Sequence, residues 1–205
     1  WMTNDDDRGE YNPVLTVTDG EVQVEHELTI IVSDEREQIV RLNRGWSLMS
    51  LNIAPGEEYY IEDENRGPNP RLMMEAWRNN EDELLLIILR DNWGEFCAPR
   101  WNYYGIQFWN LQEGYWIKLS EAWDASWTGE PIGPETEIRI AEGWNLVPYY
   151  PMYELPADGV SEFYAFTSVI DDIVIVKNGY GDFLMPEFGF SNMRPCLPGM
   201  GFQIN

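Results

Sequence analysis

The residue types that metal sites and most hydrolytic active sites require are scarce in this sequence. Its 205 residues include one histidine, His26, and two cysteines, Cys97 and Cys196. Structural zinc takes four Cys or His ligands, and a nucleophilic triad needs a histidine beside an activated serine. The Gly-x-Ser-x-Gly turn that presents such a serine does not occur. The sequence therefore excludes structural zinc within one chain and predicts no catalytic residue, so we expect a protein that is not an enzyme.

Carboxylates are abundant, but none stands out as part of a catalytic pair. Glycosidases hold two carboxyl groups about 5 to 9 Å apart, and spacing singles out no pair among the 36 acidic residues. The acidic N-terminal stretch offers one candidate calcium site, made of Asp5, Asp7 and Asp19. This stretch lacks the ligand spacing of an EF-hand loop, so a solvated acidic turn is the alternative. Calcium is the one cofactor that the sequence leaves open.

The two cysteines allow two interpretations. Cys97 and Cys196 either form a disulfide, which would suit an extracellular protein, or are two inert buried thiols. Their spacing in the sequence does not decide between the two.

Aromatic residues are the third group with recognisable chemistry. Trp93 and Tyr180 lie in short turns rich in Asn and Gly, where a small module has little room to bury a large ring. An exposed ring there would stack on a sugar or receive an apolar patch of a partner protein. The alternative is that each ring packs onto the neighbouring module. Trp101 and Tyr104 belong to a second aromatic cluster, most of which we expect in the core, with one or two rings left at a groove.

The charge of the chain excludes two classes of partner. With 36 acidic and 13 basic residues the formal net charge is −23, and the sequence pI is about 4.1. Nucleic acids and anionic membrane surfaces are bound by clustered Lys and Arg, of which the chain has few. No apolar run approaches the roughly 20 residues of a membrane-spanning helix. We therefore expect no nucleic-acid partner and no membrane insertion.

An internal repeat organises most of the chain. Three segments recur in the same order: 41–48 and 139–146, 88–99 and 175–186, and 114–117 and 201–204. The last two matches share one offset (94 to 181 and 114 to 201, 87 residues in each case), and the first is offset by 98 residues (41 to 139). Ordered matches at a shared spacing indicate a duplicated module. Positions related by these offsets are called equivalent below.

Each copy reads as strand, helix, strand, hairpin and strand. In the first copy Asn69 and Pro70 form a cap and first-turn pair, which predicts a short helix over 70–78. Residues 157–166 should take the same place in the second copy. Apolar runs at 84–89 and 173–176 predict central strands, and the Asn- and Gly-containing turns at 91–94 and 178–181 predict hairpins. The strand that begins at Trp46 has apolar residues on both sides, so we expect both of its faces to be buried.

The fold class that follows is mainly β, of the α+β kind. Residues 13–34 alternate as two strands joined at Asp19-Gly20, a hairpin that is marginally stable alone. The domains we expect are an N-terminal hairpin fragment at 1–36, one β-rich module at 37–135 and a second at 136–205, each module with one short helix. Trp123 and Trp127 lie near the boundary between the modules and are expected at their junction.

Two parts of the chain resemble known families. The tyrosine, valine-threonine strand, Asp-Gly turn and final strand of 11–34 resemble the end of a bacterial immunoglobulin-like domain of the cadherin or polycystic-kidney-disease type. The blocks at 143–146, 176–186 and 198–204 resemble a module of large secreted proteins of Bacteroidetes-type bacteria. The first resemblance implies that the N-terminal part is a partial domain. The second implies an exported, multi-module surface protein and carries no catalytic activity.

The sequence therefore favours a non-enzymatic extracellular module pair. We expect it to act as an adhesion, spacer or interaction segment of a larger bacterial surface or secreted protein, beside other domains of that chain. A protein or a glycan is the partner that we expect. The alternative is a carbohydrate-binding module that uses Trp93 and Tyr180, with Trp101 and Tyr104 as further candidates. The acidic composition of the chain suits a protein that stays soluble in salty or calcium-bearing water outside the cell.

Overall fold

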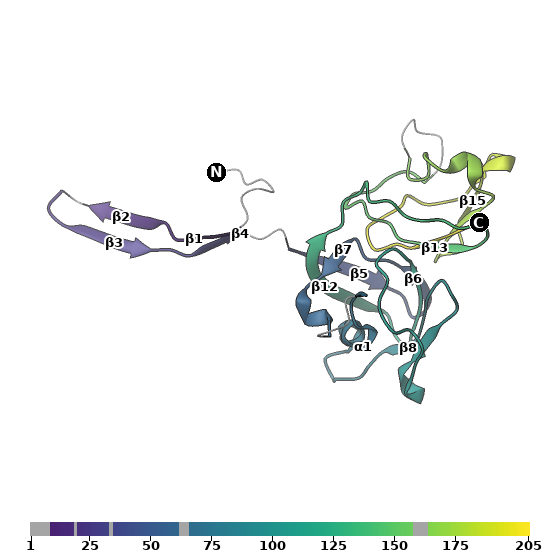
Figure 1. Ribbon diagram of the computed structural model, residues 1–205, viewed down its shortest axis with the longest axis horizontal. Helices are drawn as coiled ribbons and strands as arrows, with labels where there is room; N and C mark the ends of the chain where they lie inside the picture. The colour runs from purple at the N-terminus through teal and green to yellow at the C-terminus, as the bar shows by residue number, and fades with distance from the viewer. Residues whose placement is uncertain (1–8, 19, 33–34, 62–65, 158–163) are drawn as a thin grey trace. The chain divides into compact units, whose positions relative to one another are not determined.

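The computed structural model describes residues 9–18, 20–32, 35–61, 66–157 and 164–205 (Figure 1). The chain is mainly β, as predicted, and its strands pair antiparallel throughout the described part. It divides into two compact units, Trp1–Glu35 and Arg36–Asn205. Both predicted modules therefore lie within one compact unit.

The first unit contains the predicted hairpin. β2 (Val14–Thr18) pairs with β3 (Gln23–Glu27) across a turn in which Gly20 has a φ of 95°. The second predicted strand is divided in two, because β4 (Ile30–Val32) leaves β3 to pair with β1 (Gly9–Tyr11). Every residue of β2 and β3 is exposed, including His26 opposite Leu15. This hairpin buries neither of its faces among the described residues of its own unit.

The second unit contains two five-stranded sheets of the same order. The first runs β10 (Tyr103–Tyr104), β9 (Phe96–Ala98), β8 (Leu86–Arg90), β11 (Tyr115–Leu119), β6 (Gly45–Met49). The second runs β16 (Phe190–Ser191), β15 (Phe183–Met185), β14 (Val176–Asn178), β17 (Phe202–Ile204), β13 (Asn145–Val147). Each strand of the first sheet is equivalent to the strand at the same place in the second.

The turns of the two sheets correspond as well. A 3-10 turn, η4 (Pro99–Trp101), follows β9, and its equivalent, η6 (Pro186–Phe188), follows β15. Each ends at a left-handed residue, Asn102 with a φ of 53° and Gly189 with a φ of 57°. Asparagine and glycine are the residues that adopt this conformation at least cost. The two modules therefore share the same backbone path at this turn.

The predicted helix is present in the first module. α1 (Pro70–Met73) begins where the Asn69 Oδ1 accepts a hydrogen bond from the Arg71 backbone N–H, and it continues as η3 (Met74–Trp77). In the second module the prediction of a helix over 157–166 falls largely outside the described residues. The described residues 164–205 of that module contain the 3-10 turns η5 (Ile170–Asp172) and η6 but no α-helix. One further 3-10 turn, η2 (Glu57–Tyr59), precedes α1.

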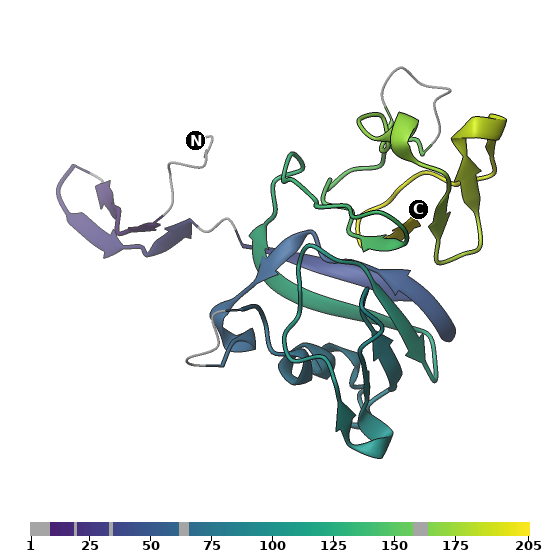
Figure 2. The same ribbon diagram turned by 45° about the vertical axis from the view of Figure 1, so that its right-hand side comes forward.

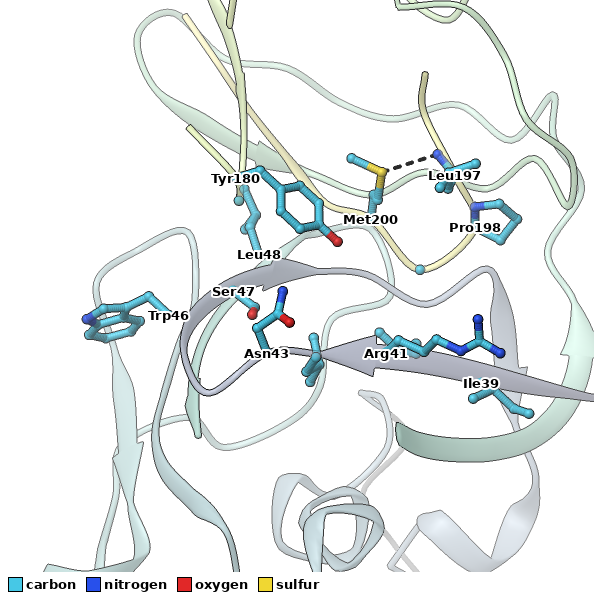
Figure 3. A pocket seen from close by; sticks show the side chains of 14 residues that line it. Ile39, Arg41, Asn43, Trp46, Ser47, Leu48, Tyr180, Leu197, Pro198 and Met200 are labelled. Atoms are coloured by element: carbon cyan, nitrogen blue, oxygen red, sulfur yellow. Dashed lines mark hydrogen bonds between the residues drawn. The ribbon is translucent and has the colours of Figure 1, made fainter. Parts of the chain in front are cut away.

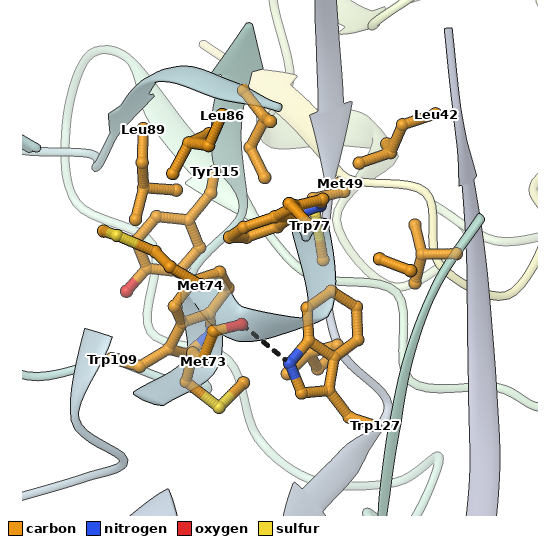
Figure 4. Packing of buried hydrophobic residues seen from close by; sticks show 14 of the residues in the cluster. Leu42, Met49, Met73, Met74, Trp77, Leu86, Leu89, Trp109, Tyr115 and Trp127 are labelled. Carbon is orange, nitrogen blue, oxygen red and sulfur yellow. Dashed lines mark hydrogen bonds between the residues drawn. The ribbon is translucent and has the colours of Figure 1, made fainter. Parts of the chain in front are cut away.

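The core of the first module is built around Trp77 (Figure 4). The rings of Trp109 and Trp127 lie against it at centroid distances of 6.1 and 5.4 Å. The Trp127 Nε1–H donates to the Met73 carbonyl oxygen (3.2 Å), which ties this ring to the helix. Such large, fully buried rings make this cluster the main apolar contribution to stability.

A third sheet closes this core from one side. β12 (Trp123–Pro131) pairs along its length with β5 (Arg36–Leu42) and at its end with β7 (Ile53–Pro55) (Figure 2). Trp123 and Trp127 belong to this strand and pack into the core of the first module. The expectation that they lie at the junction of the two modules is therefore wrong, because β12 folds back onto β5 instead of bridging to the second copy.

The two cysteines lie in different cores. Cys97 belongs to the cluster around Trp77, and Cys196 belongs to the cluster of the second module around Phe202. Both are buried free thiols. The disulfide considered from the sequence is therefore not formed, because each thiol is enclosed by its own module.

The two modules meet through reciprocal contacts. The Gly201 N–H donates to the Leu48 carbonyl oxygen (3.3 Å), and the equivalent Gly114 N–H donates to the equivalent carbonyl oxygen, that of Leu146 (3.1 Å). When residue i contacts residue j and the equivalent of j contacts the equivalent of i, two units are related by a twofold axis. The modules are therefore packed like the two halves of a symmetric dimer.

Candidate ligand-binding groove

The hairpin turns carry Trp93 and Tyr180 in matching positions. The Asp91 Oδ1 accepts a hydrogen bond from the Trp93 backbone N–H, and the Asn178 Oδ1 accepts one from the Tyr180 backbone N–H (2.9 Å each). Both residues are exposed, Trp93 by 77% and Tyr180 by 50% of their surface. The alternative, in which each ring packs onto the neighbouring module, holds in part for Tyr180, which lines a hollow with residues of the first module while half-exposed. It does not hold for Trp93, whose Nε1–H donates to Glu113 of its own module.

The residue before each ring makes the contact between the modules. The Asn92 Oδ1 accepts a hydrogen bond from the Leu146 backbone N–H (2.7 Å). Its equivalent, Gly179, lies so close to the Leu48 backbone that a Cβ atom there would be 2.6 Å from the Leu48 nitrogen. The turns therefore anchor the modules to each other while presenting the next side chain to solvent.

Trp93 faces an acidic setting. Its Nε1–H donates to the Glu113 Oε1 (3.0 Å), and a hollow of about 360 Å³ beside it is also lined by Asp91 and Glu95. The pKa of the Asp91 carboxyl is raised, because burial outweighs the opposing effect of the hydrogen bond from the Trp93 backbone N–H. These acidic side chains disfavour an anionic ligand beside Trp93.

Tyr180 faces a different setting, between two adjoining hollows of about 320 and 570 Å³. The Arg194 guanidinium lies 4.1 Å from the centre of its ring and is held by the Asp182 carboxylate (2.6 Å). That hydrogen bond lowers the pKa of Asp182. In the smaller hollow the Tyr180 ring lies above Leu48 and Asn43, with Arg41 farther along (Figure 3).

The larger hollow lies over the outer face of both five-stranded sheets. Trp46 and Trp116 meet edge to face, with ring centroids 6.4 Å apart, because they project from neighbouring strands. Arg90 and Lys177 line the same hollow, together with Gln203. We call the surface formed by Trp46, Arg90, Trp116, Lys177 and Tyr180 the aromatic groove.

The cations of the aromatic groove lack carboxylate partners within the described residues. Neither Arg90 nor Lys177 forms an ion pair with any described Asp or Glu, in a chain whose net charge is −23. The Lys177 ammonium instead lies 4.7 Å from the Trp144 ring centre, and Lys118 lies 5.6 Å from that of Trp46. Both lysines of the chain are thus held over tryptophan rings.

Of the four aromatic residues predicted from the sequence, the structure brings only Tyr180 into this groove. Trp101 is exposed on η4, as its equivalent Phe188 is on η6, and neither lines the groove. Tyr104 is half-buried beneath the Arg71 guanidinium, which lies 3.9 Å from its ring centre.

Trp46 and Trp116 were not predicted as site residues. The expectation that the strand from Trp46 is buried on both faces holds for residues 48–51, which are all buried, but fails at its start, because Trp46 is 47% exposed and its equivalent Trp144 is 46% exposed. Trp116 and Lys118 of the neighbouring strand β11 flank the Trp46 ring and leave about half of this residue exposed. The recurrence of Gly-Trp at 45–46 and 143–144 was the available signal.

The predicted calcium ligands Asp5, Asp7 and Asp19 lie outside the described residues, so that site stays a prediction. Among the residues that are described, no three or more His, Cys, Asp or Glu side chains are grouped as a metal site would require. Within the same residues, no helix has the length and apolar character needed to span a membrane.

Comparisons with known proteins found no matching family model, no matching curated protein and no matching solved structure.

Proposed function

We propose that this chain is a non-enzymatic interaction module of a larger exported bacterial protein, and that it binds its partner through the aromatic groove. The observation that carries the proposal is the concentration there of exposed rings with cations that have no acidic partner among the described residues. Exposed Trp, Tyr and Arg are the side chains that contribute most to binding at protein surfaces. An adhesive or spacer segment of a surface protein would use such a groove to hold its partner.

A carbohydrate is the partner class that the groove's chemistry favours. Trp46, Trp116 and Tyr180 offer flat apolar faces of the kind on which sugar rings stack. Gln203 lines the same hollow and offers an amide that can both donate to and accept from hydroxyl groups. Arg and Lys side chains bind anions by charge-assisted hydrogen bonds. Because Arg90 and Lys177 line the hollow, we propose a sugar that carries a carboxylate.

The test is a glycan array probed with the full chain and with matched variants. Trp46→Ala and Tyr180→Ala each remove one ring of the aromatic groove, and about a tenfold loss of affinity is expected for each, equivalent to about 1.4 kcal/mol. Trp101→Ala removes a ring that lies outside the groove and is even more exposed, and it should change affinity less than about twofold. Lys177→Gln should weaken binding of carboxylate-bearing sugars more than binding of their neutral counterparts.

Two results would count against these assignments. Binding that survives the Trp46 and Tyr180 variants unchanged would remove the aromatic groove as the site. A complete absence of binding across the array would remove the carbohydrate and leave a protein partner as the class to be sought.

A further inference from the structure

The segment at 134–140 is the equivalent of β5 but is not a strand. In β5 the inward residues Gln38, Val40 and Leu42 are buried, and Leu42 is only 6% exposed. The equivalent of Leu42 is Ile140, which is 42% exposed. The inward positions Thr136, Ile138 and Ile140 keep this pattern of one polar and two apolar residues, but Thr136 and Ile140 stay exposed, and Ile138 is only partly buried against the second core.

Among the described residues, the strand that covers β5 has no counterpart beside 134–140. In the first module β12 runs antiparallel to β5, with Trp123 opposite Leu42, Ala125 opposite Val40 and Trp127 opposite Gln38. No strand of the described chain pairs with 134–140, and the backbone N–H and C=O groups of 137–140 form no hydrogen bond with described residues. Unpaired backbone beside an apolar face is a template for another strand.

The uncovered face is a groove of about 310 Å³ that reaches the second core. Its apolar lining includes Ile138, Val147, Tyr149, Phe166 and Phe202. The first-module equivalents of three of these, Val40, Met49 and Tyr115, belong to the same buried cluster as Trp127. The groove is therefore the place that the tryptophans of β12 fill in the first module.

We propose that this groove, lined by Ile138, Ile140, Val147, Tyr149 and Phe166 and called the acceptor groove below, binds an extended segment of a partner protein as an added antiparallel strand. By the register of β12 on β5, the segment carries a large aromatic opposite Ile140, a small residue opposite Ile138 and a second aromatic opposite Thr136. The two aromatic residues are thus four positions apart on one face of the segment.

The charged residues of 137–139 predict which residues the partner segment carries on its outward face. In the third sheet Arg41 of β5 forms an ion pair with Asp124 of β12, the residue that follows Trp123 (3.5 Å). The equivalent of Arg41 is Arg139, which forms no ion pair with the described residues and calls for an acidic residue at the same place. Glu137, two residues earlier and exposed, favours a basic residue opposite it.

The direct test uses a synthetic peptide with the sequence of 121–132, which contains β12 and its two tryptophans, and the full chain. Fluorescence anisotropy should show saturable binding, and hydrogen exchange should show new protection of the amides of 137–140. A peptide with both tryptophans changed to alanine should bind at least tenfold more weakly. Equal binding of the two peptides, or no saturable binding, would overturn the proposal.

A matched pair of protein variants locates the binding. Ile140→Asp places a charge in the acceptor groove at a half-exposed position, so the fold should tolerate it, and binding should fall at least tenfold. Ile39→Asp makes the same change on the outward face of β5 and should leave binding of the peptide unchanged. Loss of peptide binding in both variants would contradict the location.

The protein alone must also be examined by sedimentation. A chain that stays monomeric across micromolar concentrations leaves its acceptor groove open for a partner and supports the proposal. Self-association that the peptide reverses would show that a second copy of this chain is the occupant, which would overturn the assignment to a different protein. Neither result depends on whether the aromatic groove binds a sugar.

Discussion

At the scale of single residues, burial decides the chemistry of the two thiols. Cys196 is fully enclosed in the second core, and burial raises the pKa of its thiol from the ordinary 9.0 to about 12. Burial also raises the pKa of Cys97. A thiol without a thiolate form near neutral pH is neither a nucleophile nor a metal ligand. Both cysteines therefore act as small apolar core residues.

This burial predicts a loss of stability in alkali. In the unfolded chain Cys196 ionises near pH 9, whereas in the folded protein it stays protonated until about pH 12. The unfolded state therefore binds fewer protons between these values, and the free energy of unfolding contributed by this group falls by about 1.4 kcal/mol for each pH unit above 9. Urea unfolding at pH 8 to 10, compared with Cys196→Ala, measures this term.

The comparison with Cys196→Ala also provides the control, because the variant lacks the thiol that ionises. The difference in unfolding free energy between the wild type and Cys196→Ala should shrink as the pH rises above 9, because only the wild type loses the thiol's contribution. Thiol titration should find no reactive group in the native protein and two in urea. A difference that does not change with pH would mean that the thiol is accessible to water.

At the scale of elements, a cap and a core residue fix the helix of the first module. The Asn69 side chain satisfies one of the free N–H groups at the start of α1, and Trp77 at the end of η3 enters the centre of the core. The chain entering the helix is also held by the hydrogen bond from the Asn69 N–H to the Tyr59 carbonyl oxygen (2.7 Å). The position of Trp77, the tryptophan at the centre of the core, thus depends on how this short helix begins.

Loss of the Asn69 cap should destabilise the protein. Asn69→Ala removes the acceptor for the Arg71 N–H and should lower the free energy of unfolding by about 1 kcal/mol. Asn69→Asp keeps an acceptor of the same reach and should stay within about 0.5 kcal/mol of the wild type. Urea unfolding followed by tryptophan fluorescence measures both. Equal losses in the two variants would show that the side-chain hydrogen bond is not the cause.

At the scale of the whole second unit, glycines allow the two modules to approach. Gly114 and Gly201 donate the two reciprocal hydrogen bonds between the modules, and Gly179 lies against the Leu48 backbone. Glycine lacks the Cβ that would keep the backbones apart. At these glycines the modules approach backbone to backbone, and side chains such as Asn92 add further hydrogen bonds between them.

A methyl group at one of these positions should open the contact. In Gly179→Ala the new Cβ would lie 2.6 Å from the Leu48 nitrogen, so one hairpin must move, at a cost of about 1 to 3 kcal/mol in unfolding free energy. Gly133→Ala is the matched control, because its nearest neighbour would be the Thr136 Oγ1 at an ordinary 3.6 Å. Equal stability of the two variants in urea would contradict the close approach of the modules.

Much of the local structure could be predicted from the sequence. The cap at Asn69, the hairpin turns before Gly94 and Gly181, and the strand that ends at Arg90 all follow from residues close together in the chain. The burial of the strand that begins at Trp46 could be predicted only in part. On the face that carries Trp46, Leu48 and Ser50, only Trp46 stays exposed. Residues of the second module such as Gly179 lie against Leu48, and that contact depends on residues far along the chain.

The sequence by itself determined the β class and the spacing of equivalent positions, because turn preferences, caps and alternation act over a few residues. Only the tertiary structure decided that β12 covers β5, that Cys97 and Cys196 are buried apart, and that Tyr180 joins Trp46 in one groove. Each of these is a pairing between distant segments, chosen by which apolar faces are buried together. Alternation identifies the face that must be covered, but the fold selects the strand that covers it.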